Sequence, residues 1–269
     1  MPTITSVDFF IPTGRGQLFA RRWTPPAHRP RSHQPEDAPP IVLLHDSLGC
    51  VELWRDFPER LAQSTGRAVI AYDRLGFGRS DPHPGTLDLR FVHDEADDGF
   101  RLVREHLALD RFVAMGHSVG GGMAVACAAR HGRLCQGLIT VSAQSFAEDR
   151  TLAGIREAGH SFAQPGQLDR LMKYHGDKAA WVLSAWVDNW LAPGFADWKL
   201  DDELRRVDCP VLALHGDQDE YGSPAHAERI ARLTQGRAVI LEGCGHVPHR
   251  EQSERVLALI GDWLQDARR

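Results

Sequence analysis

The sequence predicts an α/β fold in which a mostly parallel, eight-stranded sheet carries helices on both faces. Short runs of continuously apolar residues recur along the chain, as is typical of strands that are covered on both faces. Most of these runs are followed by a segment with the apolar spacing of a helix, and strands that alternate with helices form parallel sheets. One long interruption of this alternation predicts a helical cap inserted into the sheet domain.

The expected elements follow in chain order. Residues 3–11 and 17–23 are apolar-rich runs on either side of Thr13-Gly14-Arg15-Gly16, which predicts a β-hairpin. Six prolines between Pro25 and Pro40 remove backbone donors, so a stiff surface loop is expected there. Six further strands are expected at residues 41–44, 68–72, 112–115, 137–141, 211–214 and 238–241, and helices at 55–64, 93–108, 119–130, 224–233 and 250–266.

The interruption covers residues 145–200, which hold helical patches and no convincing strand. The expected domains are therefore an α/β core of residues 1–144 and 201–269 and a helical cap of residues 145–200. Aromatic residues on a helical lid either form its own packing core or reach a substrate pocket. We expect at least one of the cap tryptophans to reach the pocket. The cap contains four of the seven tryptophans, Trp181, Trp186, Trp190 and Trp198.

Composition and charge exclude several classes of protein. Apolar residues make up 42% of the 269 residues and charged residues 25%, as in ordinary globular proteins. The net charge is −5 without a basic stripe, so neither nucleic acid nor an anionic membrane is an expected partner. No apolar stretch approaches the ~20 residues of a membrane span, and the N-terminus lacks the features of a signal peptide. The five cysteines form no C-x-x-C pair, which favours reduced thiols and a cytoplasmic location. The sequence carries no signal for an oligomeric state.

Gly116-His117-Ser118-Val119-Gly120 follows a predicted buried strand and opens a predicted helix of small residues. This is the context that a G-x-S-x-G nucleophile elbow requires, because the serine sits in a strained turn between strand and helix. A Cβ on either flanking glycine would collide with the adjoining backbone. The turn is expected to expose the Ser118 hydroxyl and to place the Val119 amide at the helix N-terminus, beside the same space.

A serine hydroxyl is a weak nucleophile, so this chemistry needs a base and a carboxylate that orients the base. Asp217 and Asp219 follow the strand at 211–214, and His246 follows the strand at 238–241. Both loops leave the carboxyl ends of parallel strands, which is the edge where open sheets bind ligands. The order Ser, Asp, His along the chain is the one expected for this architecture.

Four motifs stand out along the chain: His45-Asp46-Ser47-Leu48-Gly49, Asp73-Arg74-Leu75-Gly76-Phe77-Gly78-Arg79-Ser80, the elbow, and the loops with Asp219 and His246. Together they resemble the α/β-hydrolase superfamily, in particular its small capped members with a serine nucleophile, over nearly the whole chain. The resemblance implies that Ser118 is the nucleophile, His246 the general base and acid, and Asp219 its orienting carboxylate. Asp217 is the rival for the last role, with capping of its own loop as the structural alternative. Some relatives place the acid one strand earlier, but residues 142–144 hold no carboxylate.

The resemblance also implies an oxyanion hole made by the backbone amides of Val119 and Ser47. In relatives the first of these loops begins His-Gly, and here Asp46 replaces that glycine. An aspartate tolerates unusual φ values, so the loop is able to keep its shape, but its carboxylate must point away from the oxyanion. The Ser47 hydroxyl either adds a donor to the hole or caps the turn. The substrate pocket is expected to include Leu48, Trp186, Trp190 and Val247.

The remaining histidines and one glycine-containing loop fit structural roles. His45 and His215 end strands and are expected to be buried and hydrogen-bonded, and His117 is expected to be a packing or pocket residue. His249 has no evident set of partner ligands, so no metal site is expected. Residues 73–80 lack the lysine of a phosphate loop and are expected to shape the chain beneath the cap. No cofactor is expected.

The sequence thus favours a serine hydrolase that cleaves a carboxylic ester or related acyl bond of a small, ester-like molecule. Enol-lactone hydrolysis, C–C bond hydrolysis, thioester cleavage and cofactor-free perhydrolase or lyase chemistry use the same triad and stay open as alternatives. A serine at position 118 argues against haloalkane dehalogenases and epoxide hydrolases, which need an aspartate there. Outside enzymes, the alternatives are a ligand-binding receptor with a vestigial triad and an inactive scaffold.

Overall fold

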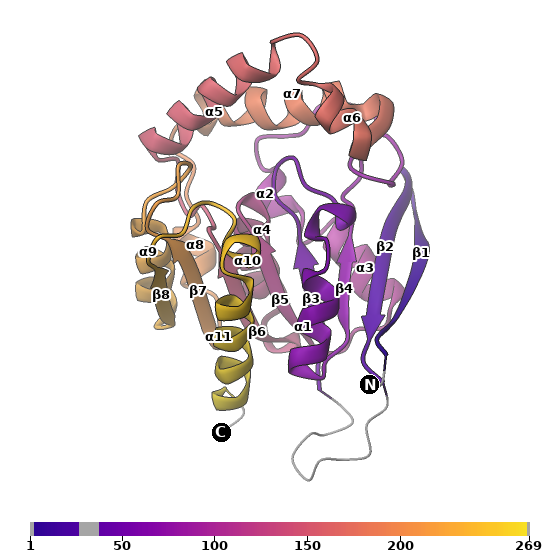
Figure 1. Cartoon of the computed structure of the whole chain (residues 1–269), viewed down its shortest axis with the longest axis vertical. Helices are drawn as coiled ribbons and strands as arrows, with labels where there is room; N and C mark the ends of the chain where they lie inside the picture. The colour runs from indigo at the N-terminus through magenta and orange to yellow at the C-terminus, as the bar shows by residue number, and fades with distance from the viewer. Residues whose placement is uncertain (1–2, 27–37, 268–269) are drawn as a thin grey trace.

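The computed structural model describes residues 3–26 and 38–267, and its strands form one sheet (Figure 1). The strands lie in the order β1-β2-β4-β3-β5-β6-β7-β8. β1 pairs with β2, and β2 with β4, in antiparallel fashion, and the other neighbours are parallel. This arrangement confirms the predicted mostly parallel, eight-stranded sheet. The strands are β1 (Thr5–Thr13), β2 (Gly16–Thr24), β3 (Ile41–Leu44), β4 (Val69–Tyr72), β5 (Phe112–His117), β6 (Cys135–Val141), β7 (Val211–Gly216) and β8 (Arg237–Leu241).

Helices cover both faces of the sheet. Successive residues of a strand point to opposite faces, so alternate residues of one strand join different buried clusters. Val42 and Leu44 of β3 belong to one buried cluster, which includes residues of α3, α4, α8 and α9. Ile41 and Leu43 belong to a second cluster, which includes residues of α1 and α11. The helices are α1 (Phe57–Thr65), α2 (Phe91–Asp94), α3 (Gly99–His106), α4 (Val119–His131), α5 (Asp149–Phe162), α6 (Asp169–His175), α7 (Ala179–Trp190), α8 (Asp201–Leu204), α9 (Ala225–Thr234), α10 (Pro248–Glu251) and α11 (Ser253–Asp266).

Two predicted helices are each broken into two. The prediction of one helix over residues 93–108 is wrong, because α2 ends at Asp94 and α3 begins at Gly99. Asp98 leaves the helical region (φ −108°, ψ −105°), and the amide of Phe100 donates to a carbonyl five residues back. The prediction of one helix over residues 250–266 is also wrong, since α10 and α11 are separated at Gln252 (φ −131°, ψ 48°). The predicted proline-rich loop lies largely outside the described residues.

The segment between β6 and β7 contributes α5, α6 and α7, which form a layer over one end of the sheet (Figure 1). Its two ends meet in a short antiparallel bridge between Phe146 and Lys199. Trp190 and Trp198 pack against each other, with ring centroids 5.4 Å apart, and both contact Phe195. Among the described residues, no helix is both long and apolar enough to span a bilayer.

The loop at residues 73–80 supports this helical layer from below. The Gly78 amide donates to His175 Nδ1 of α6 (2.9 Å), and Lys178 Nζ donates to the carbonyls of Gly78 and Ser80 (2.8 and 2.9 Å). The Trp181 ring of α7 lies so close to Gly76 that a Cβ there would be 2.3 Å from a ring carbon. The loop therefore has the structural role that its sequence predicts.

Candidate active site

Ser118 occupies the sharp turn between β5 and α4. Its backbone is strained for a non-glycine residue (φ 56°, ψ −127°), and the residue as a whole is 7% exposed. The neighbouring glycines are required by close backbone contacts. A Cβ on Gly116 would lie 1.9 Å from the carbonyl oxygen of Gly120, and a Cβ on Gly120 would lie 2.2 Å from that of Leu44. The local geometry is that of the predicted nucleophile elbow.

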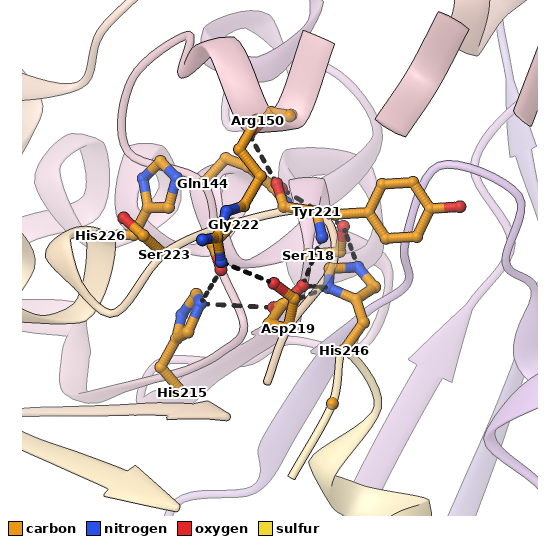
Figure 2. Close-up of polar contacts among 12 residues, drawn as sticks. Ser118, Gln144, Arg150, His215, Asp219, Tyr221, Gly222, Ser223, His226 and His246 are labelled. Carbon is orange, nitrogen blue, oxygen red and sulfur yellow. Dashed lines mark hydrogen bonds and ion pairs between the residues drawn. The ribbon is translucent and has the colours of Figure 1, made fainter. Parts of the chain in front are cut away.

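Ser118, His246 and Asp219 lie in one line of polar contacts (Figure 2). Ser118 Oγ is 3.1 Å from His246 Nε2. On the other side of the ring, His246 Nδ1 is 2.8 Å from both carboxylate oxygens of Asp219. The structure thus brings together the three residues that the sequence predicts as a triad, from the loops after β5, β7 and β8.

Asp219 is buried and held in place from several sides. Its carboxylate accepts a hydrogen bond from the Tyr221 amide (2.8 Å), and His215 Nε2 lies 3.3 Å away (Figure 2). Burial alone would raise the pKa of Asp219, but the hydrogen bond and charge of His246 outweigh it, so the pKa lies below its usual value. The rival Asp217 accepts the Cys244 amide (3.2 Å), so it links its loop to the loop after β8.

Gln144 is a neighbour of Ser118 that the sequence prediction missed. Its Oε1 lies 3.3 Å from Ser118 Oγ, a second hydrogen-bond partner beside His246 (Figure 2). Gln144 follows β6 and lies at the same edge of the sheet as the other loops of the site. A polar residue directly after a predicted parallel strand is the sequence feature from which its role could have been predicted. The side-chain amide of Gln144 is neutral, so it can hold the Ser118 hydroxyl in position without adding charge to the site.

Ser47, in the loop after β3, lines the same cavity as Ser118. The orientation of the Ser47 amide is fixed by the peptide bond that joins it to Asp46. The carbonyl oxygen of Asp46 lies 2.9 Å from Arg74 Nη2 and 2.8 Å from His45 Nδ1. Because C=O and N–H point in opposite directions across a trans peptide, this anchoring turns the Ser47 amide away from Arg74. Within the described chain, the amides of Ser47 and Val119 donate to no other residue.

The Asp46 carboxylate does not occupy the space expected for an oxyanion. One oxygen accepts the Leu48 amide (3.0 Å), and the other lies 3.4 Å from His117 Nδ1. Burial would raise the pKa of Asp46, but the hydrogen bond and charge of His117 lower it well below its usual range. Asp46 is absent from the residues with positive φ, so the loop does not need the glycine that it lacks.

His117 has a linking role that the sequence did not predict. Its Nε2 lies 2.8 Å from the carbonyl of His246, while its Nδ1 faces Asp46. The ring therefore connects the loop of the candidate base to the loop of the candidate oxyanion hole. His249 stacks edge-on against it, with centroids 4.7 Å apart, and burial keeps the pKa of His249 well below its usual value.

The remaining buried histidines are largely satisfied, as expected. His45 contacts Arg74 and the Asp46 carbonyl, and His215 Nε2 lies 3.1 Å from the Gly222 carbonyl while its Nδ1 has no partner. In the part of the chain that the structure describes, no three His, Cys, Asp or Glu side chains are grouped to hold a metal ion.

A cavity of about 320 Å³ lies between these loops and the helical layer. The predicted residues Leu48, Trp186, Trp190 and Val247 all line it. Trp181 and Trp198 are not among the lining residues, so two of the four tryptophans reach the cavity and two pack elsewhere. Its other lining residues are Asp46, Ser47, Leu53, His117, Ser118, Gln144, Thr151, Ile155, Arg170, Leu171, Tyr174, Tyr221, His246, His249 and Arg250.

Comparison with known proteins supports the same fold. Proline iminopeptidase of Lactobacillus helveticus (strain DPC 4571) is 27% identical over 271 residues, which cover 85% of this chain and 90% of that protein. The 2-hydroxy-6-oxo-6-phenylhexa-2,4-dienoate hydrolase of Rhodococcus sp. strain RHA1 superposes with a TM-score of 0.75 at 18% identity, covering 98% of this chain and 100% of the other. A thermophilic esterase of Thermogutta terrifontis gives 0.71 at 21% identity, covering 98% and 99%.

The family assignment rests on a match along most of the chain. A model of the alpha/beta hydrolase family matches residues 41–259, a range that includes every loop of the candidate site. The two solved structures show the shared fold, and their different activities agree with a fold that hosts many chemistries. The chain therefore belongs to the alpha/beta hydrolase family of enzymes.

Proposed function

We propose that this protein is a serine hydrolase that cleaves a carboxylic ester or related acyl bond of a small substrate through an acyl-enzyme. The observation that carries the proposal is the line of contacts from Ser118 Oγ to His246 Nε2 (3.1 Å) and from His246 Nδ1 to Asp219 (2.8 Å). These are the distances that a nucleophile, a base and an orienting carboxylate require. The cavity beside Ser118 supplies room for a small substrate.

In the first half of the reaction, Ser118 Oγ attacks the carbonyl carbon while His246 Nε2 takes its proton. The negative charge that develops on the carbonyl oxygen is stabilised by the amides of Ser47 and Val119. His246 then returns the proton to the leaving alcohol, and the bond between the acyl carbon and the leaving oxygen breaks. Asp219 holds the ring with Nδ1 protonated and stabilises its charged form.

In the second half, water takes the place of the alcohol. His246 removes a proton from the water as it attacks the acyl carbon, and the same two amides stabilise the second oxyanion. Protonation of Ser118 Oγ by His246 releases the carboxylic acid. Every step uses side chains and backbone groups of this chain, and none requires a cofactor.

Cleavage of esters fits the cavity better than the aminopeptidase activity of the curated relative. An enzyme that acts at a peptide N-terminus must bind a charged amino group, and a carboxylate is the usual partner for such a cation. Asp46 is the single carboxylate among the lining residues of the described chain, and it is already engaged by the Leu48 amide and His117. The cavity therefore offers an ammonium group no uncommitted carboxylate.

The test is steady-state hydrolysis of p-nitrophenyl esters from acetate to octanoate by the wild type and four variants. Ser118→Ala and His246→Ala are expected to lower kcat/KM by about 10⁴-fold or more with the fold retained, because both act on the reacting atoms. Asp219→Asn is expected to cost about 10³–10⁴-fold, since the wrong tautomer of the base is favoured. Asp217→Asn is the matched control and is expected to turn over near the wild-type rate.

Two results would contradict the proposal. A Ser118→Ala protein with wild-type activity would remove the serine mechanism, and equal losses in the two aspartate variants would remove the assignment of Asp219. Repeated turnover in the wild type separates an enzyme from a ligand-binding receptor, which would release at most one equivalent of product.

A further inference from the structure

The charged side chains that line the cavity are not balanced. Arg170 of α6 and Arg250 of α10 both line it, and Asp46 is the only acidic residue that does so in the described chain. Asp46 is committed to the Leu48 amide and to His117. The whole chain has a net charge of −5, so two unmatched arginines beside the nucleophile contrast with the charge of the protein as a whole. Charges inside a cleft with low-dielectric walls act more strongly on a substrate than charges spread over a surface.

Arg250 is an exposed residue at the cavity and has no carboxylate partner. Its guanidinium donates to the backbone carbonyl of Leu53, and no acidic oxygen of the described residues lies within ion-pair distance of it. Burial lowers the pKa of Arg250, the charge of Arg55 lowers it further, and the charge of Asp46 opposes both effects. A carbonyl bond leaves the charge itself uncompensated, so an anion bound here would be favourable.

Arg170 presents a second free guanidinium to the same space. Among the described residues it takes part in no side-chain hydrogen bond and no ion pair. Other arginines of this chain find carboxylates: Arg229 makes two bonds to Asp201 (2.7 and 2.8 Å), and Arg21 bonds Asp8. The two cavity arginines have no such partner, as is also true of several arginines elsewhere on the described surface, and what distinguishes them is that they line the cavity.

The apolar part of the cavity lining comes from other helices than the arginines. Ile155 of α5 and Trp186 and Trp190 of α7 form an apolar wall, whereas the arginines come from α6 and α10. A substrate that satisfied both surfaces would carry an apolar part and a negatively charged group. The guanidinium fork matches the geometry of a carboxylate in particular.

We propose that the site is specific for acidic substrates: esters that carry a free carboxylate, such as the half-esters of dicarboxylic acids, held by Arg170 and Arg250. The inference rests on the proposed hydrolase function and adds the substrate class to it. The carboxylate of the substrate supplies the counter-ion that the cavity lacks. The reaction is the same hydrolysis, in which water is consumed and the alcohol and the diacid are released.

The test compares two esters that differ only at the far end of the acyl chain. Monomethyl adipate carries a carboxylate where methyl hexanoate carries a methyl group, and hydrolysis of each is followed by proton release at constant neutral pH. The wild type is expected to prefer the half-ester by at least about tenfold in kcat/KM, the magnitude of one charge-assisted hydrogen bond. Equal rates, or a preference for methyl hexanoate, would overturn the proposal.

Variants assign the preference to the two arginines. Arg170→Gln and Arg250→Gln are each expected to reduce the ratio of the two kcat/KM values by about tenfold. Arg250→Lys keeps the charge and is expected to restore part of the preference. Arg156→Gln removes an exposed arginine of α5 that does not line the cavity, and the ratio should stay at the wild-type value. A preference that survives in the Arg170→Gln/Arg250→Gln double variant would also overturn the assignment.

Binding measured without catalysis separates this inference from the proposed function. In the Ser118→Ala protein, calorimetry is expected to give tighter binding of monomethyl adipate than of methyl hexanoate. If that preference is found but the wild type hydrolyses neither ester nor any p-nitrophenyl ester, the hydrolase proposal fails and the acidic ligand class stands. If the wild type hydrolyses both esters without preference, the hydrolase proposal stands and the acidic class fails.

Discussion

At the scale of single residues, Arg74 is the side chain on which the candidate oxyanion loop most depends. It is buried, stacks on the Phe77 ring at 4.1 Å, and donates to the Asp46 carbonyl. Arg74→Met would remove that donor and allow the peptide before Ser47 to rotate. We expect kcat to fall by about 10- to 100-fold with KM nearly unchanged, because the amide acts on the transition state.

The kcat of the Arg74→Met variant must be calculated per reactive active site and not per total protein. Titration with a fluorophosphonate that reacts with Ser118 counts the competent molecules, so a loss of folded protein is not mistaken for a loss of kcat. Arg74→Lys is the comparison variant, since it keeps a cationic donor but not the fork that contacts both His45 and Asp46. A rise in KM at constant kcat would show that Arg74 positions substrate and not the oxyanion loop.

The residues of the candidate triad could be predicted from the sequence because each belongs to a local pattern. Ser118 stands between two glycines at a strand–helix junction, and Asp219 and His246 follow strands directly. The contacts of Arg74 and His117 could not be predicted in this way. They join segments far apart in the chain, and no local spacing specifies which carbonyl a buried side chain meets.

At the scale of elements, the break between α2 and α3 brings a buried carboxyl group into the core. Glu95 follows α2, accepts the Tyr72 hydroxyl, and contacts Gly99 at the start of α3. The apolar positions of Phe100 and Val103 have helical spacing, which is why the sequence predicts one helix here. Periodicity detects the buried face but not the point at which a polar side chain interrupts the hydrogen-bond ladder.

Glu95 makes stability depend on pH. Burial raises its pKa from 4.5 to about 7, so between these values the folded protein keeps a proton that the unfolded chain has lost. Stability from this group is therefore present below about pH 4.5 and falls as the pH rises to 7. We expect the free energy of unfolding of the wild type to fall, relative to Glu95→Gln, by up to about 3 kcal/mol over that range. Urea unfolding at several pH values measures it.

The control for this prediction is Glu59→Gln, which replaces an exposed glutamate of α1. Its difference from the wild type should stay constant with pH. If the Glu95→Gln and wild-type curves run parallel between pH 4.5 and 7, the buried carboxyl does not titrate in this window.

At the scale of the whole molecule, the helical layer rests on the core through contacts that lie away from the triad. Trp181 packs on Phe77, with centroids 5.5 Å apart, and donates to the Gly85 carbonyl (2.7 Å). Trp181→Ala should loosen α7 over the cavity, so we expect KM to rise by about fivefold, or roughly 1 kcal/mol, with a smaller change in kcat.

Hydrogen exchange checks the structural part of this prediction. Amides of α5 to α7 should exchange faster in Trp181→Ala, while those of the central strands keep their protection. Met172→Ala is the control, since it removes an exposed apolar side chain from the same layer. A fall in kcat with KM constant would indicate that the substitution disturbs the triad and not the cover of the cavity.

The cavity itself is the part of the molecule that the sequence predicts least. Trp186 and Trp190 could be predicted as cavity residues because the helical segment is rich in tryptophan. Nothing in the sequence around Arg170 and Arg250 distinguishes them from other arginines, so their place in the cavity could not be predicted. Which side chains turn inward depends on how three helices pack over five loops. The strands and the chemistry at their ends follow local patterns, but the substrate preference depends on this packing.

The sheet order also has a consequence for how the protein is made. β8 is an edge strand, and His246, which follows it, comes 128 residues after Ser118. On the ribosome, the proposed nucleophile emerges long before the proposed base, so the elbow can form on β3, β5 and β6 while it has no partner to accept its proton. If the proposed mechanism holds, the newly made chain therefore gains activity only after β8 has joined the sheet.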